Sequence, residues 1–275
     1  MITRDNSLLV RVKIKAMGTG VADKEISNEV HVAHNVSDDA GTYIKRVFLR
    51  KDLEDIYSAF HQVVTIKKRY TLPWMDGNIR LLPSKAFDLF TKELQKGIES
   101  VDAAVDGVVN RFEEIEESTK KRLNSMWKDD QFPSKESFKE AFGIRVSYLP
   151  IPDKGDFRVG GETVKSSFDN EMDEQAKLAQ SEIWKRFKEV IQHFYKMTSE
   201  KDKGFKETLV DKIEDLTKLA KILNMDNDKD IEKFRKEVAD KLTGFSAKDL
   251  KDDKDFKFQK AQEAKALLEK LDSYL

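Results

Sequence analysis

Two long stretches of this chain carry apolar residues at alternating steps of three and four, and this spacing limits the folds open to it. The stretches cover residues 84–127 and 165–200. In a helix this spacing places the apolar residues in one stripe along one face. The first helix would be on the order of 60 Å long at about 1.5 Å per residue. A stripe of that length must be covered by another helix. We therefore expect the two stretches to form an antiparallel coiled-coil hairpin. The apolar positions are Phe87, Phe90, Leu94, Ile98, Val101, Val105, Val108, Phe112 and Ile115 in the first stretch, and Met172, Ala176, Ala179, Ile183, Phe187, Val190, Phe194 and Met197 in the second.

The composition favours elongated helices over one large globular core. Hydrophobic residues make up 39% of the chain and charged residues 37%, against roughly 45–50% and about 25% in ordinary globular domains. Helices that each bury a single stripe and expose the rest to water satisfy this balance. The 17 Phe and 3 Trp residues argue against a disordered chain.

Short strands are predicted from alternation of apolar and polar residues. Residues 8–16 alternate β-branched and basic side chains, and residues 143–152 show the same period. We expect these two strands to pair, because neither is stable alone. Leu81 and Leu82 fit a short strand before Pro83, and 157–159 fits an edge strand.

The remaining elements are predicted to be helices. Short helices are expected at 22–34, 51–70 and 133–142, and three apolar stripes predict a helical bundle over 204–275 with connecting turns at 224–230 and 244–255. The predicted fold class is thus mainly α (α+β). It combines a long antiparallel helical coiled-coil hairpin, a small antiparallel β-sheet and a C-terminal helical bundle. The predicted domains are a small α/β platform (1–83 and 128–161), a coiled-coil stalk (84–127 and 165–200) and the bundle (204–275).

The sequence argues against several classes of function. The net charge is −1 and Cys is absent, which argues against a globally basic DNA binder and against thiolate chemistry. Gly18-Thr-Gly20 follows a strand but lacks the other residues of a nucleotide-binding turn. His31 and His34 share a helical face without a third ligand at metal spacing. We therefore expect no enzyme, no cofactor and no metal. No signal peptide or membrane span is apparent, so a cytoplasmic protein is expected.

Two kinds of surface contact are predicted. The basic run Lys67, Lys68 and Arg69 lies beside Tyr70 and Trp74, a mixture used to contact nucleic acid, although cations at a helix end also suit the helix dipole. The loops 71–80 and 149–158 combine prolines, tight turns and charged residues, with structural turning of the chain as the alternative reading. The candidate partner contacts in these loops are Trp74, Asp76, Arg80, Asp153, Asp156 and Arg158.

Several motifs together carry a resemblance that spans nearly the whole chain. They are 70–74 (Tyr-Thr-Leu-Pro-Trp), 80–83 (Arg-Leu-Leu-Pro), 142–146 (Phe-Gly-Ile-Arg-Val), 149–158 (Leu-Pro-Ile-Pro-Asp-Lys-Gly-Asp-Phe-Arg), 205–209, 223–226 and 261–271. In these the chain resembles a family of bacteriophage and mobile-element proteins known as a domain of unknown function. Members of that family tend to be encoded beside a MoxR-like AAA+ ATPase and a protein with a von Willebrand A domain. The resemblance brings no catalytic residues to this chain.

The expected function is therefore that of a phage or mobile-element interaction or adaptor protein in the cytoplasm of a bacterial host. Its expected partner is a protein, and the resemblance points to the AAA+ ATPase with its von Willebrand A neighbour. The alternative is a DNA-associated protein or an inhibitor of a host nuclease or defence complex. Oligomerisation is left open, because a heptad stripe can pair within one chain or between chains.

Overall fold

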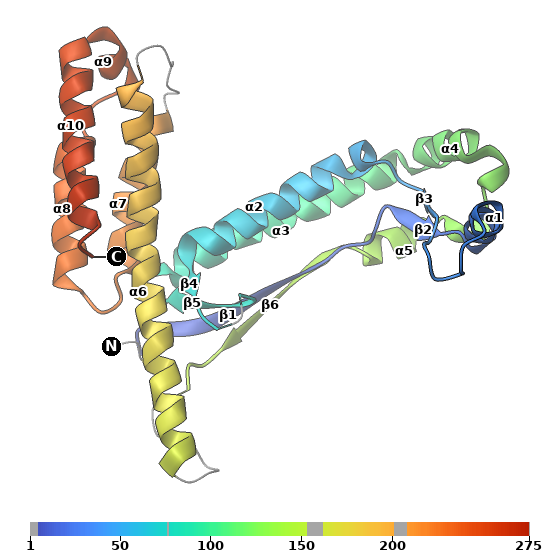
Figure 1. Ribbon diagram of the computed structural model, residues 1–275, viewed down its shortest axis with the longest axis horizontal. Helices are drawn as coiled ribbons and strands as arrows, with labels where there is room; N and C mark the ends of the chain where they lie inside the picture. Colours follow the sequence, from blue (N-terminus) through green and yellow to red (C-terminus); the bar gives the residue numbers. More distant parts are fainter. Residues whose placement is uncertain (1–4, 76, 153–161, 201–207, 275) are drawn as a thin grey trace. The chain divides into compact units, whose positions relative to one another are not determined.

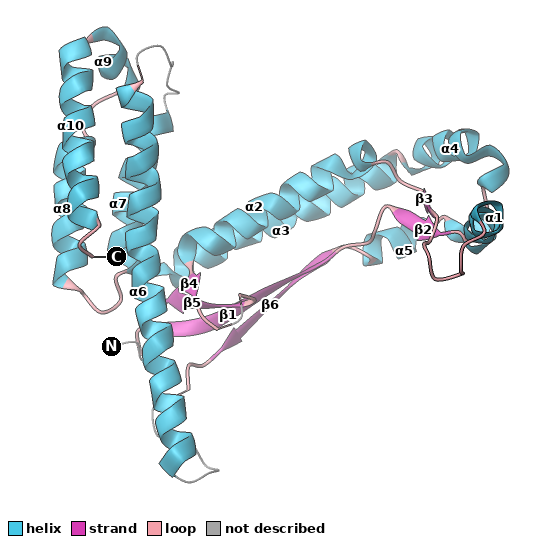
Figure 2. Cartoon of the chain, viewed as in Figure 1, coloured by secondary structure: helices cyan, strands magenta, loops and turns pink. Residues whose placement is uncertain are grey.

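The computed structural model describes residues 5–75, 77–152, 162–200 and 208–274. The chain is mainly helical with a small antiparallel sheet, which confirms the predicted fold class at that level (Figures 1 and 2). It divides into two compact units, and four elements run from one unit into the other. Unit 1 contains residues 1–11, 68–90 and 147–275, and unit 2 contains residues 12–67 and 91–146.

Unit 1 holds most of a four-stranded sheet in the order β4-β5-β1-β6. The strands are β1 (Ser7–Lys15), β4 (Leu72–Pro73), β5 (Ile79–Pro83) and β6 (Gly143–Leu149). The predicted strands at 8–16, at Leu81-Leu82 and within 143–152 are confirmed, and the first and last of these are neighbours as expected. The predicted edge strand at 157–159 lies outside the described residues.

The helices of unit 1 share one core. They are α6 (Glu162–Ser199), α7 (Thr208–Leu223), α8 (Lys229–Leu242), α9 (Ala247–Asp252) and α10 (Lys254–Leu271). The helix α6 packs against α7 and α10, and α8 packs against α7 and α10. Phe187 and Phe234 meet edge to face in this core, with ring centroids 5.3 Å apart. Tyr274 stacks on Trp184 at 4.4 Å and thereby holds the end of the chain against the core.

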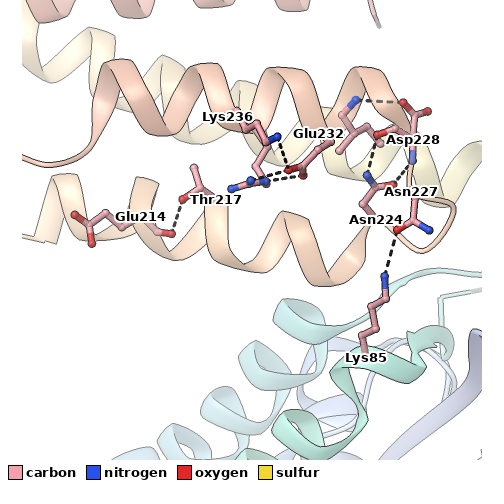
Figure 3. A network of polar contacts seen from close by, with 10 residues as sticks. Lys85, Glu214, Thr217, Asn224, Asn227, Asp228, Glu232 and Lys236 are labelled. Atoms are coloured by element: carbon pink, nitrogen blue, oxygen red, sulfur yellow. Dashed lines mark hydrogen bonds and ion pairs between the residues drawn. The ribbon is translucent and has the colours of Figure 1, made fainter.

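The turn between α7 and α8 is set by its own polar side chains. Asn224 donates to the carbonyl of Asp228 and accepts from its amide, at 2.9 and 2.8 Å (Figure 3). The Asp228 side chain in turn caps the first amides of α8. Asn227 takes a left-handed backbone conformation and accepts a hydrogen bond from Lys85. The predicted turn at 224–230 is therefore present, with α8 beginning inside it.

The predicted turn at 244–255 is corrected by α9. Ser246 and Asp249 form a reciprocal capping box, in which each side chain accepts from the other residue's backbone amide. This cap stabilises a helix of six residues within the stretch that was predicted to be a turn. Ala247 and Leu250 turn inward and are buried.

Unit 2 contains the other helices and a two-stranded sheet of β2 (Gly20–Ala22) and β3 (Ile44–Arg46). Its helices are α1 (Lys24–His34), α2 (Glu54–Tyr70), α3 (Phe87–Asn110), α4 (Phe112–Leu123) and α5 (Lys135–Glu140), and α2 and α3 extend into unit 1. The short 3-10 turns η1 (Arg50–Leu53), η2 (Ser84–Ala86), η3 (Asn124–Met126) and η4 (Asp129–Gln131) join these elements. The predicted helices at 22–34, 51–70 and 133–142 are confirmed.

The predicted continuous helix over 84–127 is broken at Arg111, between α3 and α4. The Arg111 backbone leaves the helical region there, with φ −105° and ψ 13°. Directly after the break Phe112 enters an aromatic cluster, in which its ring lies 5.2 Å from Phe132 and 5.3 Å from Phe138. Phe48 is a further member of this cluster, and at the break the Arg111 amide donates to the carbonyl of Val108 at 3.0 Å.

The predicted pairing of residues 84–127 with 165–200 is not confirmed. The stripe of α6 is covered by α7 and α10, so 165–200 shares a unit with the C-terminal helices instead of forming a separate stalk. Most of α3 belongs to unit 2. There α3 lies against α2, because a Cβ atom placed on Gly97 would be 2.9 Å from Cγ2 of Val63. The units therefore follow different boundaries from the predicted domains.

We predict opposite effects on stability for two alanine substitutions in α3. Gly107 is exposed and a Cβ there meets nothing within 4 Å, so Gly107→Ala is expected to raise the free energy of unfolding by about 0.5–1 kcal/mol. Gly97→Ala must displace the stiff, buried Val63, and overpacking of this kind costs about 1–3 kcal/mol. Urea unfolding of both variants measures the difference, and equal stabilisation would contradict close packing of α2 on α3.

Candidate functional site

Exposed apolar side chains gather in one short segment of unit 2. Of the eleven large apolar side chains exposed among the described residues, five lie within residues 30–44, which we call the exposed apolar segment. Val32 is 83% exposed and Ile44 is 61% exposed. Concentrations of exposed apolar side chains on a folded protein mark interaction surfaces. The five members are Val30, Val32, Val36, Tyr43 and Ile44.

The polarity of α1 is reversed relative to an ordinary helix of a globular domain. Its buried positions are polar, namely Ser27 and His31, and Asp23 at its N-cap is buried as well. These three residues are spaced four apart and so lie on one face of the helix. The valines at 30 and 32 are exposed instead. Since water disfavours apolar surface and burial disfavours unpaired polar groups, this reversal requires a specific polar network inside.

A buried ion pair forms the centre of that network. The Lys45 ammonium lies 2.8 Å from the Asp23 carboxylate, with 1% and 3% of the two side chains exposed. Lys45 also donates to the carbonyl of Met126 at 2.6 Å. Asp23 accepts from the amides of Glu25 and Ile26 and so caps α1. The hydrogen bond from Lys45, assisted by the capping amide of Ile26, lowers the pKa of Asp23 below its usual 3.8.

The other polar groups tie the loop after α1 to the buried face of the helix. The Ser27 hydroxyl donates to the carbonyl of Asp23 at 2.6 Å and accepts from the amide of Tyr43 at 2.9 Å. Nε2 of His31 lies 2.8 Å from the carbonyl of Gly41, so this nitrogen is the donor. Asn35 ends the helix in a left-handed conformation. The loop is thus fixed at both ends, which displays the apolar side chains in a set arrangement.

Gly20 has a structural role beside this segment. It pairs with Arg46 in the two-stranded sheet of β2 and β3, and a Cβ atom at this position would lie 2.6 Å from Cγ2 of Ile44. A larger residue at position 20 would displace Ile44. Gly20, in the Gly18-Thr-Gly20 stretch, is therefore required because a neighbouring strand approaches it closely.

The predicted partner contact at Trp74 is corrected by its burial. Trp74 is 0% exposed and belongs to the core of unit 1, together with Leu72 and Leu81. The indole fills space between the sheet and the helices of unit 1 and is not available as a surface anchor. The sequence suggested exposure because prolines and a tight turn surround this residue.

Arg80 is engaged inside unit 1. Its guanidinium donates to the hydroxyl of Thr71 at 2.6 Å and to the carbonyl of Thr71 at 3.1 Å. Burial lowers the pKa of Arg80, and the nearby positive charge of Arg186 lowers it further. Asp76, Asp153, Asp156 and Arg158 lie outside the described residues, so the predicted contacts at these four positions stay predictions.

The basic run at 67–69 forms the last turn of α2, where partners within the chain meet it. Arg69 forms an ion pair with Asp215 at 3.2 Å. Arg186 of α6 donates to the carbonyls of Lys68, Arg69 and Thr71, at 2.8–3.0 Å, and so caps the C-terminus of α2. Lys68 is exposed and Lys67 is half-buried. Contact of Lys67, Lys68 and Arg69 with nucleic acid stays a prediction.

No group of three or more His, Asp or Glu side chains in the described parts of the chain is placed to hold a metal ion. No helix there is both long enough and apolar enough to cross a membrane.

Comparison with known proteins adds no relative. No family model, no curated protein and no solved structure matches this chain. The resemblance to the phage and mobile-element family therefore stays a prediction.

We predict that Asp23→Asn destabilises unit 2 near neutral pH and that this loss vanishes in acid. Asn retains the capping oxygen but removes the charge that faces Lys45. The folded-state pKa of Asp23 is lowered from 3.8, so its carboxylate stabilises the fold above that value and ceases to do so as the pH falls through the lowered pKa.

Urea unfolding of wild type and variant over a series of pH values measures this dependence. Asp102→Asn is the matched control, because Asp102 is exposed on α3 and takes part in no ion pair among the described residues. The control should show no such convergence in acid. A difference for Asp23→Asn that stays constant down to about pH 2 would contradict the ion pair.

Proposed function

We propose that this chain is a non-enzymatic interaction protein that binds a protein partner through the exposed apolar segment. The observation that carries this proposal is the reversed polarity of α1. Burying Asp23, Ser27 and His31 while Val30 and Val32 face water does not serve the stability of an isolated chain. It serves a surface that a partner covers.

The energy available at this surface is sufficient for specific binding. Full burial of one Val, Ile or aromatic side chain contributes about 1.5–3 kcal/mol, and the segment offers five such side chains. Association costs several kcal/mol in lost freedom, so only the surplus appears as affinity. The buried network lowers that cost, because the loop that carries Tyr43 is already held by Ser27 and His31.

We further propose that the partner belongs to a phage or mobile-element assembly in the bacterial cytoplasm. The resemblance supports a MoxR-like AAA+ ATPase and a von Willebrand A protein as the members of that assembly. In it this chain would act as an adaptor or as a subunit that presents a substrate to the ATPase. A second copy of the chain is the other occupant that an apolar surface accepts.

A DNA-associated role, or inhibition of a host nuclease or defence complex, is the alternative function. One observation favours its DNA-binding form: Arg11, Lys13 and Arg145 are exposed and take part in no ion pair among the described residues.

We predict that Val32→Ser combined with Ile44→Ser abolishes capture of the partner. Co-expression with the MoxR-like ATPase and the von Willebrand A protein of the same genome, followed by affinity purification, measures the captured amount. We expect at least a tenfold loss, because two exposed apolar contacts are removed. Circular dichroism checks that the variant is folded.

Phe258→Ser is the matched control. Phe258 is 65% exposed but lies on α10 of unit 1, so its loss should leave capture unchanged. Absence of any complex at micromolar concentration, or equal capture by the double variant, would overturn the proposed partner. Light scattering of the isolated chain tests the second copy, since a dimer lost only in the double variant would assign the surface to self-association.

A further inference from the structure

The sheet narrows to two strands as it enters unit 2. The pairing of β5 with β1 ends where Ile79 faces Arg11. Beyond that point the structure gives β1 only β6 as a neighbour, so Val12–Lys15 and Gly143–Val146 form a two-stranded antiparallel ribbon (Figure 2). We call these eight residues, all of them in unit 2, the basic ribbon.

The basic ribbon carries the charges of β1 on one face. Along β1 the residues Arg11, Lys13 and Lys15 are exposed, whereas Val12 and Ile14 between them are buried and half-buried. Side chains of a strand alternate between faces, so the three cations point to the same side. On β6 Arg145 is also exposed.

These cations have no acidic partner within the described chain. Arg11, Lys13 and Arg145 take part in none of the ion pairs between described residues, and Lys15 donates only to the backbone carbonyl of Glu140. Like charges at alternate positions of a strand repel one another and weaken the sheet. No acidic side chain among the described residues relieves that repulsion, so within this part of the chain the charges do not serve stability.

A hollow of about 440 Å³ opens on the basic ribbon. Residues 13–15 and 143–145 line it, and among them are three cations, two isoleucines and no acidic residue. Gly143 has no side chain, and a Cβ there would meet nothing within 4 Å. The cations at this hollow therefore favour an anion, and the hollow is open enough for an extended polymer such as a nucleic-acid strand.

We infer that the basic ribbon binds the sugar-phosphate backbone and major groove of double-stranded DNA. The major groove, about 12 Å wide, admits a two-stranded β-ribbon. Alternate residues of a strand are about 6.8 Å apart, so Lys13 and Lys15 can each contact a separate phosphate. This site is distinct in residues and chemistry from the exposed apolar segment.

Fluorescence anisotropy with a labelled mixed-sequence duplex of about 24 base pairs tests the inference, at about 50 and 150 mM salt. The wild type should bind, with an affinity that falls as salt rises. Lys13→Glu with Arg145→Glu should weaken binding at least tenfold at the lower salt and reduce the slope of log affinity against log salt by about two. Lys13→Gln with Arg145→Gln, checked by circular dichroism, repeats the test without charge reversal.

The matched control is Lys248→Glu with Lys251→Glu. Both lysines are exposed on α9 of unit 1, and the net charge changes by the same amount. Binding within about twofold of wild type is expected from this control. Val32→Ser with Ile44→Ser should also bind DNA normally, so failure of the DNA site and failure of the protein-binding surface are distinguishable.

Three outcomes would overturn the inference. The first is no binding of the duplex by wild type at the lower salt. The second is a loss in the control variant as large as in the basic ribbon variants. The third is tighter binding of a single strand of equal length, or of tripolyphosphate, than of the duplex, because either ligand would assign the hollow to a different anion.

Discussion

The buried ion pair between Asp23 and Lys45 is the interaction on which the exposed apolar segment depends. Removing two charges from water carries a large desolvation cost, which is offset only when geometry and further hydrogen bonds are good. Here the carboxylate also caps α1 and the ammonium also holds the carbonyl of Met126. This ion pair therefore connects α1, the strand β3 and the η3 turn after α4. With the buried side of α1 committed to polar groups, its valines are left facing water.

Unit 2 consequently presents two surfaces of different chemistry. The exposed apolar segment offers contact area, which determines how long a complex lasts, whereas the basic ribbon offers charge, which mainly raises the rate of encounter and varies with salt. The exposed side chains of the two surfaces do not contribute to the core of the unit. If the two proposed surfaces bind as we infer, the chain would bring a protein and a polyanion together, which is what an adaptor does.

Local patterns predicted the elements well, but they did not predict which elements cover one another. Alternation along 8–16 and 143–152 identified β1 and β6, and spacing of three and four identified α3 and α6. The same spacing states only that a stripe is covered, and in α6 the cover comes from α7 and α10. The break at Arg111 follows from rings that meet Phe112 from distant positions in the chain. The exposed apolar segment was missed because valines in a short helix look like core until the polar residues beside them are seen to be buried.

The two basic clusters illustrate why charge must be weighed against its partners. The run at 67–69 stands out in the sequence, yet Asp215 meets Arg69 and the adjacent carbonyls are taken by Arg186. Three consecutive cations there stabilise the end of a helix whose dipole favours them. The cations of β1 are separated by apolar residues and resemble an ordinary wet face of a strand. Only the sheet register shows that these cations lie where β1 is no longer paired with β5. Among the described residues that line the hollow beside them there is no carboxylate. Charge without an internal partner, rather than charge density in the sequence, is what marks a surface for an external anion.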